Sequence, residues 1–249
     1  MDMNPFYREE DLFPREFTGV TERPWGFLYR SADNSDSYDS NHALIFRGRV
    51  TDLSAVLEEI ADFYLSRGQR PIIYQSILDD GWFGDIAPAL SAAGYRSWQE
   101  KQHWMVLTED SRIRALADVR RVTAWSDDLA VHLYEAAGEP WEIAVAKRQL
   151  ENPNTLYFAA FTEDKPVGAI YGHVNDAGIC RIDYLLVANA FRGRGLGRAL
   201  THAFVTHCRI RGIPCALWPD GDTPRRIYEE AGFRYVCTKQ AGRAVWAEK

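Results

Sequence analysis

The sequence predicts an α/β (α+β) protein with two related halves, and three patterns lead to this prediction. A strand-like run, Cys180–Val187, enters a glycine-rich turn. An amphipathic helix leaves the turn, because apolar or small residues recur at helical spacing at Leu196, Ala199, Leu200, Ala203, Phe204 and Cys208. Both halves of the chain also share one order of elements: strand, helix ending in Arg-Gly, strand, short helix ending in Ala-Gly-aromatic, strand.

The elements of the first half follow from apolar runs and from turn and cap residues. Residues 1–22 are polar and are expected to be irregular. The expected elements after them are a strand at 25–29, a polar loop at 32–41, a strand at 42–46, a helix from 53 to the stop at Arg67-Gly68, a strand at 71–74, a helix at 86–93 and a strand at 98–107. Asp52 or Thr51 is the expected cap of the long helix.

The second half gives a longer series of elements by the same criteria. The expected elements are a strand at 122–125, a helix opened by residues 126–128, a break at 138–141, a second helix ending near 152–154, a hairpin of strands 156–162 and 167–174, and a strand at 178–187. The turn and its helix follow, then a strand at 215–218, a short helix ending at 231–233 and a strand at 235–237.

The glycine-rich turn reads Phe191-Arg192-Gly193-Arg194-Gly195-Leu196-Gly197-Arg198. A turn of this kind, placed between a strand and a helix, presents unpaired backbone N–H groups and a helix N-terminus to an anion. It lacks the Gly-Lys-Ser/Thr of a nucleotide-hydrolysing P-loop and the glycine spacing of a dinucleotide fold. The pattern therefore predicts a phosphate-binding loop, with a purely structural turn as the alternative.

The spacing from Val187 through Arg192 and Gly195 to Gly197 resembles the acyl-CoA loop of the GNAT superfamily of N-acetyltransferases. That loop has Arg or Gln, two residues, Gly, one residue, then Gly or Ala, and it opens a long helix. The resemblance implies a mixed, splayed, mostly antiparallel sheet and acetyl-CoA as the co-substrate. It implies a catalytic domain at residues 116–249.

The resemblance also implies where the cofactor is bound. The pantetheine arm would pair with the backbone of the strand at Leu185, Leu186 and Val187. The pyrophosphate would be bound by the residues of the turn and the start of the helix: Arg192, Arg194, Gly195, Leu196, Gly197 and Arg198.

Tyr228 stands in the sequence Tyr-x-x-x-Gly-Phe that ends at Gly232-Phe233. In the family this Tyr faces the CoA sulfur, and a phenol can protonate or hydrogen-bond the leaving thiolate. The alternative role is packing of its helix onto the sheet. Asp222 and Arg225 depart from the residues that the family often has at these positions, which weakens the prediction of side-chain contacts to CoA.

The acceptor amine must lose a proton before it attacks the thioester. Asp183 matches a position where many relatives carry a carboxylate, so it is the candidate base or ammonium ligand, and a salt bridge within the sheet is the alternative. Trp141 and Glu142, in the break between two helices, are candidate substrate-binding residues, because an aromatic ring beside a carboxylate suits a cationic amine. His173 is a further candidate base.

Composition limits the other functions. The chain has 249 residues and a net charge of −6, which argues against nucleic acid as a partner. No apolar run approaches the ~20 residues of a membrane helix, and the N-terminus lacks the pattern of a signal peptide. The four cysteines lack metal or redox spacing, so we expect buried thiols, no metal site and a cytoplasmic protein.

The first half, residues 1–115, is predicted to be a degenerate, partial GNAT-like copy. The run from Phe46 to Arg49 matches Phe191 to Arg194, but Val50-Thr51-Asp52 replaces the two late glycines. Without those glycines the backbone cannot approach a pyrophosphate closely, and Asp52 would repel it. An unrelated α/β domain is the alternative.

These observations predict an N-acetyltransferase that moves an acetyl group from acetyl-CoA to a primary amine by direct attack in a ternary complex. No cysteine stands out as a nucleophile, which favours direct transfer. The acceptor is a small-molecule amine or a peptide amine, and the chain is a monomer or a homodimer. A non-catalytic acyl-CoA sensor and a tRNA-dependent aminoacyl transferase are the alternatives, and the net acidic charge argues against the second.

Overall fold

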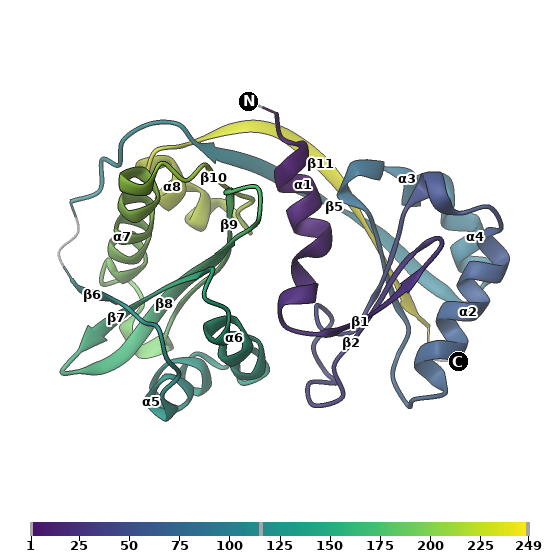
Figure 1. The fold of residues 1–249 in the computed structure, drawn as a ribbon, viewed down its shortest axis with the longest axis horizontal. Coiled ribbons are helices and arrows are strands. Elements are labelled where there is room, and N and C mark those ends of the chain that lie inside the picture. The colour runs from purple at the N-terminus through teal and green to yellow at the C-terminus, as the bar shows by residue number, and fades with distance from the viewer. Residues whose placement is uncertain (1, 115–116, 248–249) are drawn as a thin grey trace. The chain divides into compact units, whose positions relative to one another are not determined.

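The computed structural model describes residues 2–114 and 117–247, shown in Figure 1. The chain forms two compact units, the first from Met1–Gln102 with Thr238–Lys249 and the second from His103–Cys237. The domain boundary predicted between residues 115 and 116 lies outside the described residues. Within the described ranges, no helix is both long and apolar enough to cross a lipid bilayer.

The first unit is a sheet with helices. Its helices are α1 (Asn4–Leu12), α2 (Leu53–Leu65), α3 (Trp82–Asp85) and α4 (Ala87–Ala92). Its strand order is β1 (Gly19–Arg23), β2 (Gly26–Arg30), β3 (Ala43–Ile45), β4 (Ile72–Gln75) and the end of β11 (Phe233–Trp246). The pair β3 and β4 is parallel, and the other pairs are antiparallel.

The expectation that residues 1–22 are irregular is wrong, because they contain helix α1 and the start of β1. The polar composition of α1 hides a buried side that includes Phe6 and Tyr7. Tertiary contacts of these aromatic residues therefore stabilise a helix that local composition did not predict.

The second unit has a mixed, mostly antiparallel sheet, as predicted. Its strand order is the end of β5 (Tyr95–Leu107), β10 (Cys215–Leu217), β9 (Cys180–Val187), β8 (Lys165–Val174), β7 (Thr155–Thr162) and β6 (Asp118–Arg121). The pair β9 and β10 is parallel, and the pairs β5–β10, β8–β9, β7–β8 and β6–β7 are antiparallel. Its helices are α5 (Asp127–Leu129), which continues as a π-helix at Ala130–Glu135, α6 (Glu142–Glu151), α7 (Leu196–Arg211) and α8 (Asp222–Glu230).

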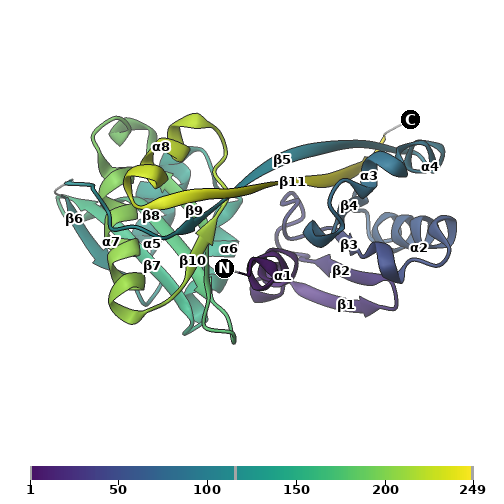
Figure 2. The same ribbon diagram turned by 90° about the horizontal axis from the view of Figure 1, so that it is seen from above.

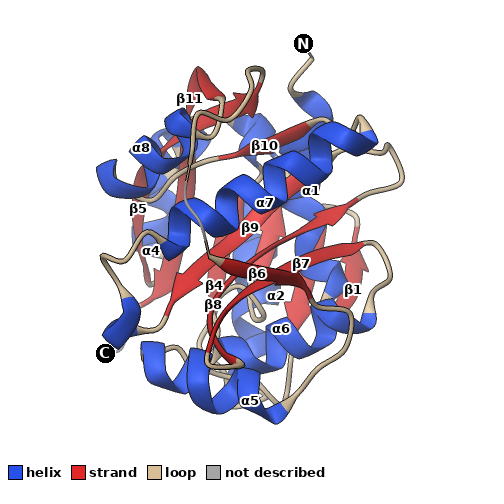
Figure 3. Cartoon of the chain, turned by 90° about the vertical axis from the view of Figure 1, so that its left-hand side faces the viewer, coloured by secondary structure: helices blue, strands red, loops and turns tan. Residues whose placement is uncertain are grey.

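Helices cover both faces of this sheet. Side chains alternate between faces along a strand, so Leu156 and Phe158 pack in one core with α7 and α8, whereas Tyr157 and Ala159 pack in another with α5 and α6. Figures 1 and 3 show α7 on one side of the sheet and α5 and α6 on the other. The long, nearly continuous burial of β7 and β8 follows from this arrangement.

The sheet is splayed beside β9. Strand β9 pairs with β8 from Cys180 to Val187, but its parallel ladder with β10 consists of Cys180–Cys215 and Arg181–Ala216. The β8–β9 register shifts beside Asp183, so this residue forms a bulge between Ile182 and Tyr184. The bulge lies where β9 and β10 separate.

Strands β5 and β11 are neighbours in the sheet and each contributes residues to both units, as can be followed in Figure 2. The end of β5 pairs with β10 in the second unit, and the end of β11 pairs with β4 in the first. The last strand, expected at 235–237, is a 14-residue strand that continues to Trp246.

Candidate active site

The glycine-rich turn connects β9 to α7 and has the conformation that its glycines permit. Gly193 has a φ of 76° and Gly195, the N-cap of α7, has a φ of 81°. Left-handed backbone of this kind is costly for residues with a Cβ atom. The turn thereby directs the first backbone N–H groups of α7, which have no intrahelical acceptor, to one point at the positive end of the helix dipole.

The arginines of the turn stabilise its shape. Arg192 donates from Nε to the Val187 carbonyl at 3.1 Å, and Arg194 donates to the Ala190 carbonyl at 3.0 Å. Both arginines are exposed, so their charges remain available to an anion. Arg198 instead forms a bidentate ion pair with Glu230 at 2.7 and 3.0 Å. This pair lowers the pKa of Glu230, and it offsets the charge that the Arg198 side chain offers.

The start of α7 converges with β9 and α8. A Cβ atom on Gly197 would lie 3.6 Å from Ile227 and 3.9 Å from Leu185, which are ordinary contacts. Leu185 and Val187 pack on the α7 side of the sheet, and Leu186 packs on the other side. After Arg181, the edge of β9 toward β10 has left the parallel ladder, so its backbone can pair with an extended ligand.

Tyr228 lies on α8 and is buried, with an edge-to-face contact of 5.8 Å to Phe233. Burial raises the pKa of Tyr228 well above its ordinary value. The phenol therefore stays protonated near neutral pH and can donate a hydrogen bond to a thiolate. Its burial and its contact with Phe233 are equally consistent with the alternative role, in which Tyr228 packs α8 onto the sheet.

Asp183 is held by an ion pair within its own strand. The Arg181 guanidinium donates to the Asp183 carboxylate with 2.6 Å between Nη1 and Oδ1, and the two side chains are 8% and 17% exposed. His173 is buried on β8 and is the register partner of Arg181, so the two side chains share a face of the sheet.

Trp141 and Glu142 lie at the start of α6, which packs against the face of the sheet that carries Tyr171 and Tyr184. Glu142 is buried and accepts a hydrogen bond from the Tyr171 hydroxyl. Tyr171 stacks between Tyr157 and Tyr184, at 5.3 and 5.7 Å between ring centroids. The Trp141 ring meets Tyr184 edge-on at 6.2 Å. Trp141 thus contacts Tyr184 directly, and Glu142 is linked to Tyr184 through Tyr171. Both predicted substrate residues are therefore connected to β9, the strand that carries Asp183.

A family model described as the Acetyltransferase (GNAT) family matches residues 121–233, the segment that contains the turn, the bulge and Tyr228. Residues 121–233 form a GNAT-family domain. Its sheet, with the splay between β9 and β10, is the GNAT fold predicted from the turn motif.

Solved structures extend the likeness of fold beyond the GNAT domain. A GCN5-related N-acetyltransferase from Kribbella flavida matches 98% of this chain and 95% of its own, with 14% identity and a TM-score of 0.63. A functionally unknown conserved protein from Staphylococcus epidermidis matches 93% and 95%, with 16% identity and a TM-score of 0.61. A GCN5-related N-acetyltransferase from Sphaerobacter thermophilus matches 94% and 84%, with 16% identity and a TM-score of 0.56. No curated protein matches the chain.

Sequence reasoning missed two groups of side chains in the GNAT domain. The first is the tyrosine stack, which consists of Tyr134, Tyr157, Tyr171 and Tyr184 and includes a 2.7 Å contact between the Tyr134 and Tyr157 hydroxyls. The usable signal for it was that Tyr157 and Ala159 in one predicted strand, and Ala169 and Tyr171 in the next, each share a strand face. The second is a meeting of Cys180, Cys208 and Cys215, for which sequence spacing gave no signal.

Proposed function

We propose that the GNAT domain transfers an acetyl group from acetyl-CoA to a primary amine by direct attack in a ternary complex. The amine nitrogen attacks the thioester carbonyl, and the CoA thiolate leaves. The proposal rests on the family match and on one observation above all: Gly193 and Gly195 adopt left-handed backbone at the N-terminus of α7. That conformation at a helix N-terminus favours a turn that binds pyrophosphate over a turn with a purely structural role.

The splay of the sheet supports the cofactor assignment. The backbone of Leu185, Leu186 and Val187 would pair with the amide groups of pantetheine, as an added strand does. This placement brings the thioester toward the bulge at Asp183. Tyr228, protonated at neutral pH, would then donate to the departing sulfur. Because burial raises its pKa, hydrogen bonding to the thiolate is more favourable than complete proton transfer.

The side of the sheet that packs against α6, opposite to the α7 side, favours a cationic amine as the acceptor. Glu142 supplies a buried carboxylate, and Trp141 with Tyr184 supplies aromatic rings that attract a cation. Asp183 would accept the ammonium proton, directly or through water. The Arg181 guanidinium, which donates to Oδ1, would hold the Asp183 carboxylate in place for this role.

Two measurements test the proposal. Acetyl-CoA should bind the purified chain in a calorimetric titration, and thiol release should depend on an added amine across a panel of polyamines, aminoglycosides, amino acids and peptides. Binding without turnover on any amine would contradict the enzymatic part. Absence of acetyl-CoA binding would contradict the whole proposal.

A non-catalytic acyl-CoA sensor is the second candidate. The observation that favours it is that both proposed catalytic side chains already have structural partners, Arg181 for Asp183 and Phe233 for Tyr228. A sensor needs the turn alone. In that case the Asp183→Asn and Tyr228→Phe variants would bind acetyl-CoA as the natural chain does, and none of the three would release thiol.

We further propose that the first unit is a GNAT-like relic without a cofactor. Asp52 caps α2 by accepting a hydrogen bond from the Ala55 N–H at 3.1 Å, so a carboxylate already occupies this helix N-terminus. Gly48 does not have the left-handed backbone of Gly193 and Gly195. The titration should therefore give one acetyl-CoA per chain, and a stoichiometry of two would contradict this assignment.

A further inference from the structure

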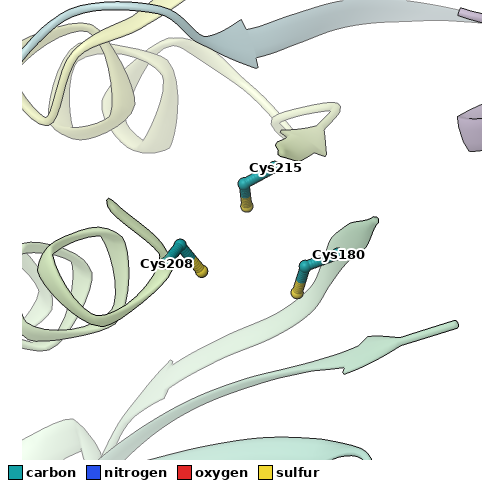
Figure 4. A group of neighbouring side chains, drawn as sticks. All are labelled: Cys180, Cys208 and Cys215. Carbon is teal, nitrogen blue, oxygen red and sulfur yellow. The ribbon is translucent and has the colours of Figure 1, made fainter. Parts of the chain in front are cut away.

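Three cysteines that are distant in sequence meet inside the second unit. Cys180 begins β9, Cys208 lies near the end of α7, and Cys215 begins β10. Their Sγ atoms all lie within 4.8 Å of one another, and Figure 4 shows the three side chains converging from these elements. None of the three forms a disulfide. We call these residues the thiol cluster.

The fold explains the meeting. Cys180 and Cys215 are register partners in the short parallel ladder of β9 and β10, so their side chains share a face of the sheet. Cys208 lies on the buried side of α7, which covers that face. An atom at the centre of a triangle with 4.8 Å sides lies about 2.8 Å from each corner, so small side-chain rotations reach the ~2.3 Å of a metal–sulfur bond.

The thiol cluster lies in an apolar part of the core. The three side chains have no solvent exposure, and their core includes Leu200 and Phe204. A ligand that left a net charge here would carry a large desolvation cost.

We propose that the thiol cluster is a three-coordinate binding site for a trivalent thiophilic metalloid, taken up as arsenite. Three thiolates neutralise a trivalent centre completely. The same thiolates would leave one buried negative charge with Zn²⁺ and two with Cu⁺. Zinc is disfavoured further, because structural zinc sites take four protein ligands and the group found in the described part of the chain has three.

The binding reaction balances without an additional reactant. Arsenite at neutral pH is the uncharged acid As(OH)₃, and each thiol replaces one hydroxide. Three As–O bonds and three S–H bonds break, three As–S bonds form, and the hydroxides leave as water with the thiol protons. Arsenic remains trivalent, so no oxidant or reductant takes part. Because the thiols are enclosed, entry requires a local opening of the core, and uptake should be slow.

The test uses the reduced full-length chain and sodium arsenite. Native mass spectrometry should show one arsenic per chain, and X-ray absorption should show three sulfur neighbours. Cys237→Ser is the matched control, because Cys237 lies outside the thiol cluster, and it should bind arsenic as the natural chain does. Cys208→Ala and Cys215→Val should each bind at least tenfold more weakly and show two sulfur neighbours.

Several results would overturn the proposal. They are absence of arsenic from the natural chain, loss of arsenic in Cys237→Ser, equal uptake by the urea-unfolded chain, and tighter binding of Zn²⁺ or Cu⁺ added alone. Thermal melts of each variant identify any that does not fold. The two cluster variants remove thiols from different elements, α7 and β10, so one variant that folds is enough for the comparison. If neither folds, Cys237→Ser and the competition with Zn²⁺ and Cu⁺ still test the site.

Discussion

Arg181 and Asp183 form an ion pair two residues apart on β9, at the point where the strand bulges and leaves β10. The pair lies on the strand that also supplies the proposed pantetheine contacts. Its two residues therefore couple the stability of the bulge to the position of the proposed base. Removing the charge of Asp183 separates these two roles.

Asp183→Asn keeps the shape of the side chain and removes its charge. We expect a loss of about 2 kcal/mol in the free energy of unfolding, because the mostly buried Arg181 guanidinium loses its charged partner. We also expect a lower kcat and loss of the acidic limb of its pH profile. Asp164→Asn is the control, since Asp164 pairs with Arg120 at an exposed position and should change stability little. An unchanged pH profile in a less stable variant would leave Asp183 with a structural role alone.

Gly195→Ala tests the phosphate-binding turn. The left-handed backbone at this position should cost an alanine about 1–2 kcal/mol, and the Kd for acetyl-CoA should rise at least tenfold as the turn relaxes. Gly212→Ala introduces similar strain at the other end of α7, where φ is 66° and a Cβ atom would meet open space. Calorimetry should therefore show weaker binding for the first variant and unchanged binding for the second. Equal affinities would refute the assignment of the turn.

Tyr228→Phe removes the phenol oxygen and keeps the ring that contacts Phe233. We expect kcat to fall about a hundredfold, as is typical when one hydrogen-bond donor to a developing anion is lost, with the Kd for acetyl-CoA unchanged. Steady-state kinetics and a cofactor titration separate the two quantities. Tyr235→Phe, at an exposed position of β11, should leave both unchanged. If Tyr228→Phe turns over at the natural rate, the residue only packs its helix.

Asp11 makes the stability of the first unit depend on pH. Burial raises the pKa of Asp11 to about 7, although its carboxylate accepts hydrogen bonds from the Ser76 hydroxyl at 2.6 Å and the Ile77 N–H at 2.9 Å. The folded state thus holds the proton more tightly than the unfolded state. The resulting stabilisation is complete below pH 3.8 and is lost as the pH rises to 7, with a slope of about 1.4 kcal/mol per pH unit.

The measurement is the difference in thermal stability between pH 5 and pH 8. It should be larger in the natural chain than in Asp11→Asn, which cannot titrate at this position. Asp36→Asn, on an exposed loop, should behave as the natural chain does. Identical pH dependence in all three proteins would show that Asp11 is not a buried proton acceptor.

Local patterns were sufficient for the elements whose stability is local. The apolar stripe of α2, its cap at Asp52 and the stop before Gly68 agree with the prediction, because caps and helical periodicity act within one or two turns. Helix α1 was missed because its aromatic residues are stabilised by contacts distant in sequence.

For the site, local sequence patterns were enough to predict the glycine turn, the strand before it and the helix after it, and hence the GNAT family of residues 121–233. A left-handed glycine and a helix N-terminus are properties of a few consecutive residues, so their spacing is informative. The folded chain was needed to show that Arg181 pairs with Asp183, that the Tyr171 hydroxyl donates to Glu142 and that three cysteines meet. Those contacts depend on the register of β8, β9 and β10 and on the packing of α6 and α7 against them. Both are established by pairing between segments that are distant in sequence.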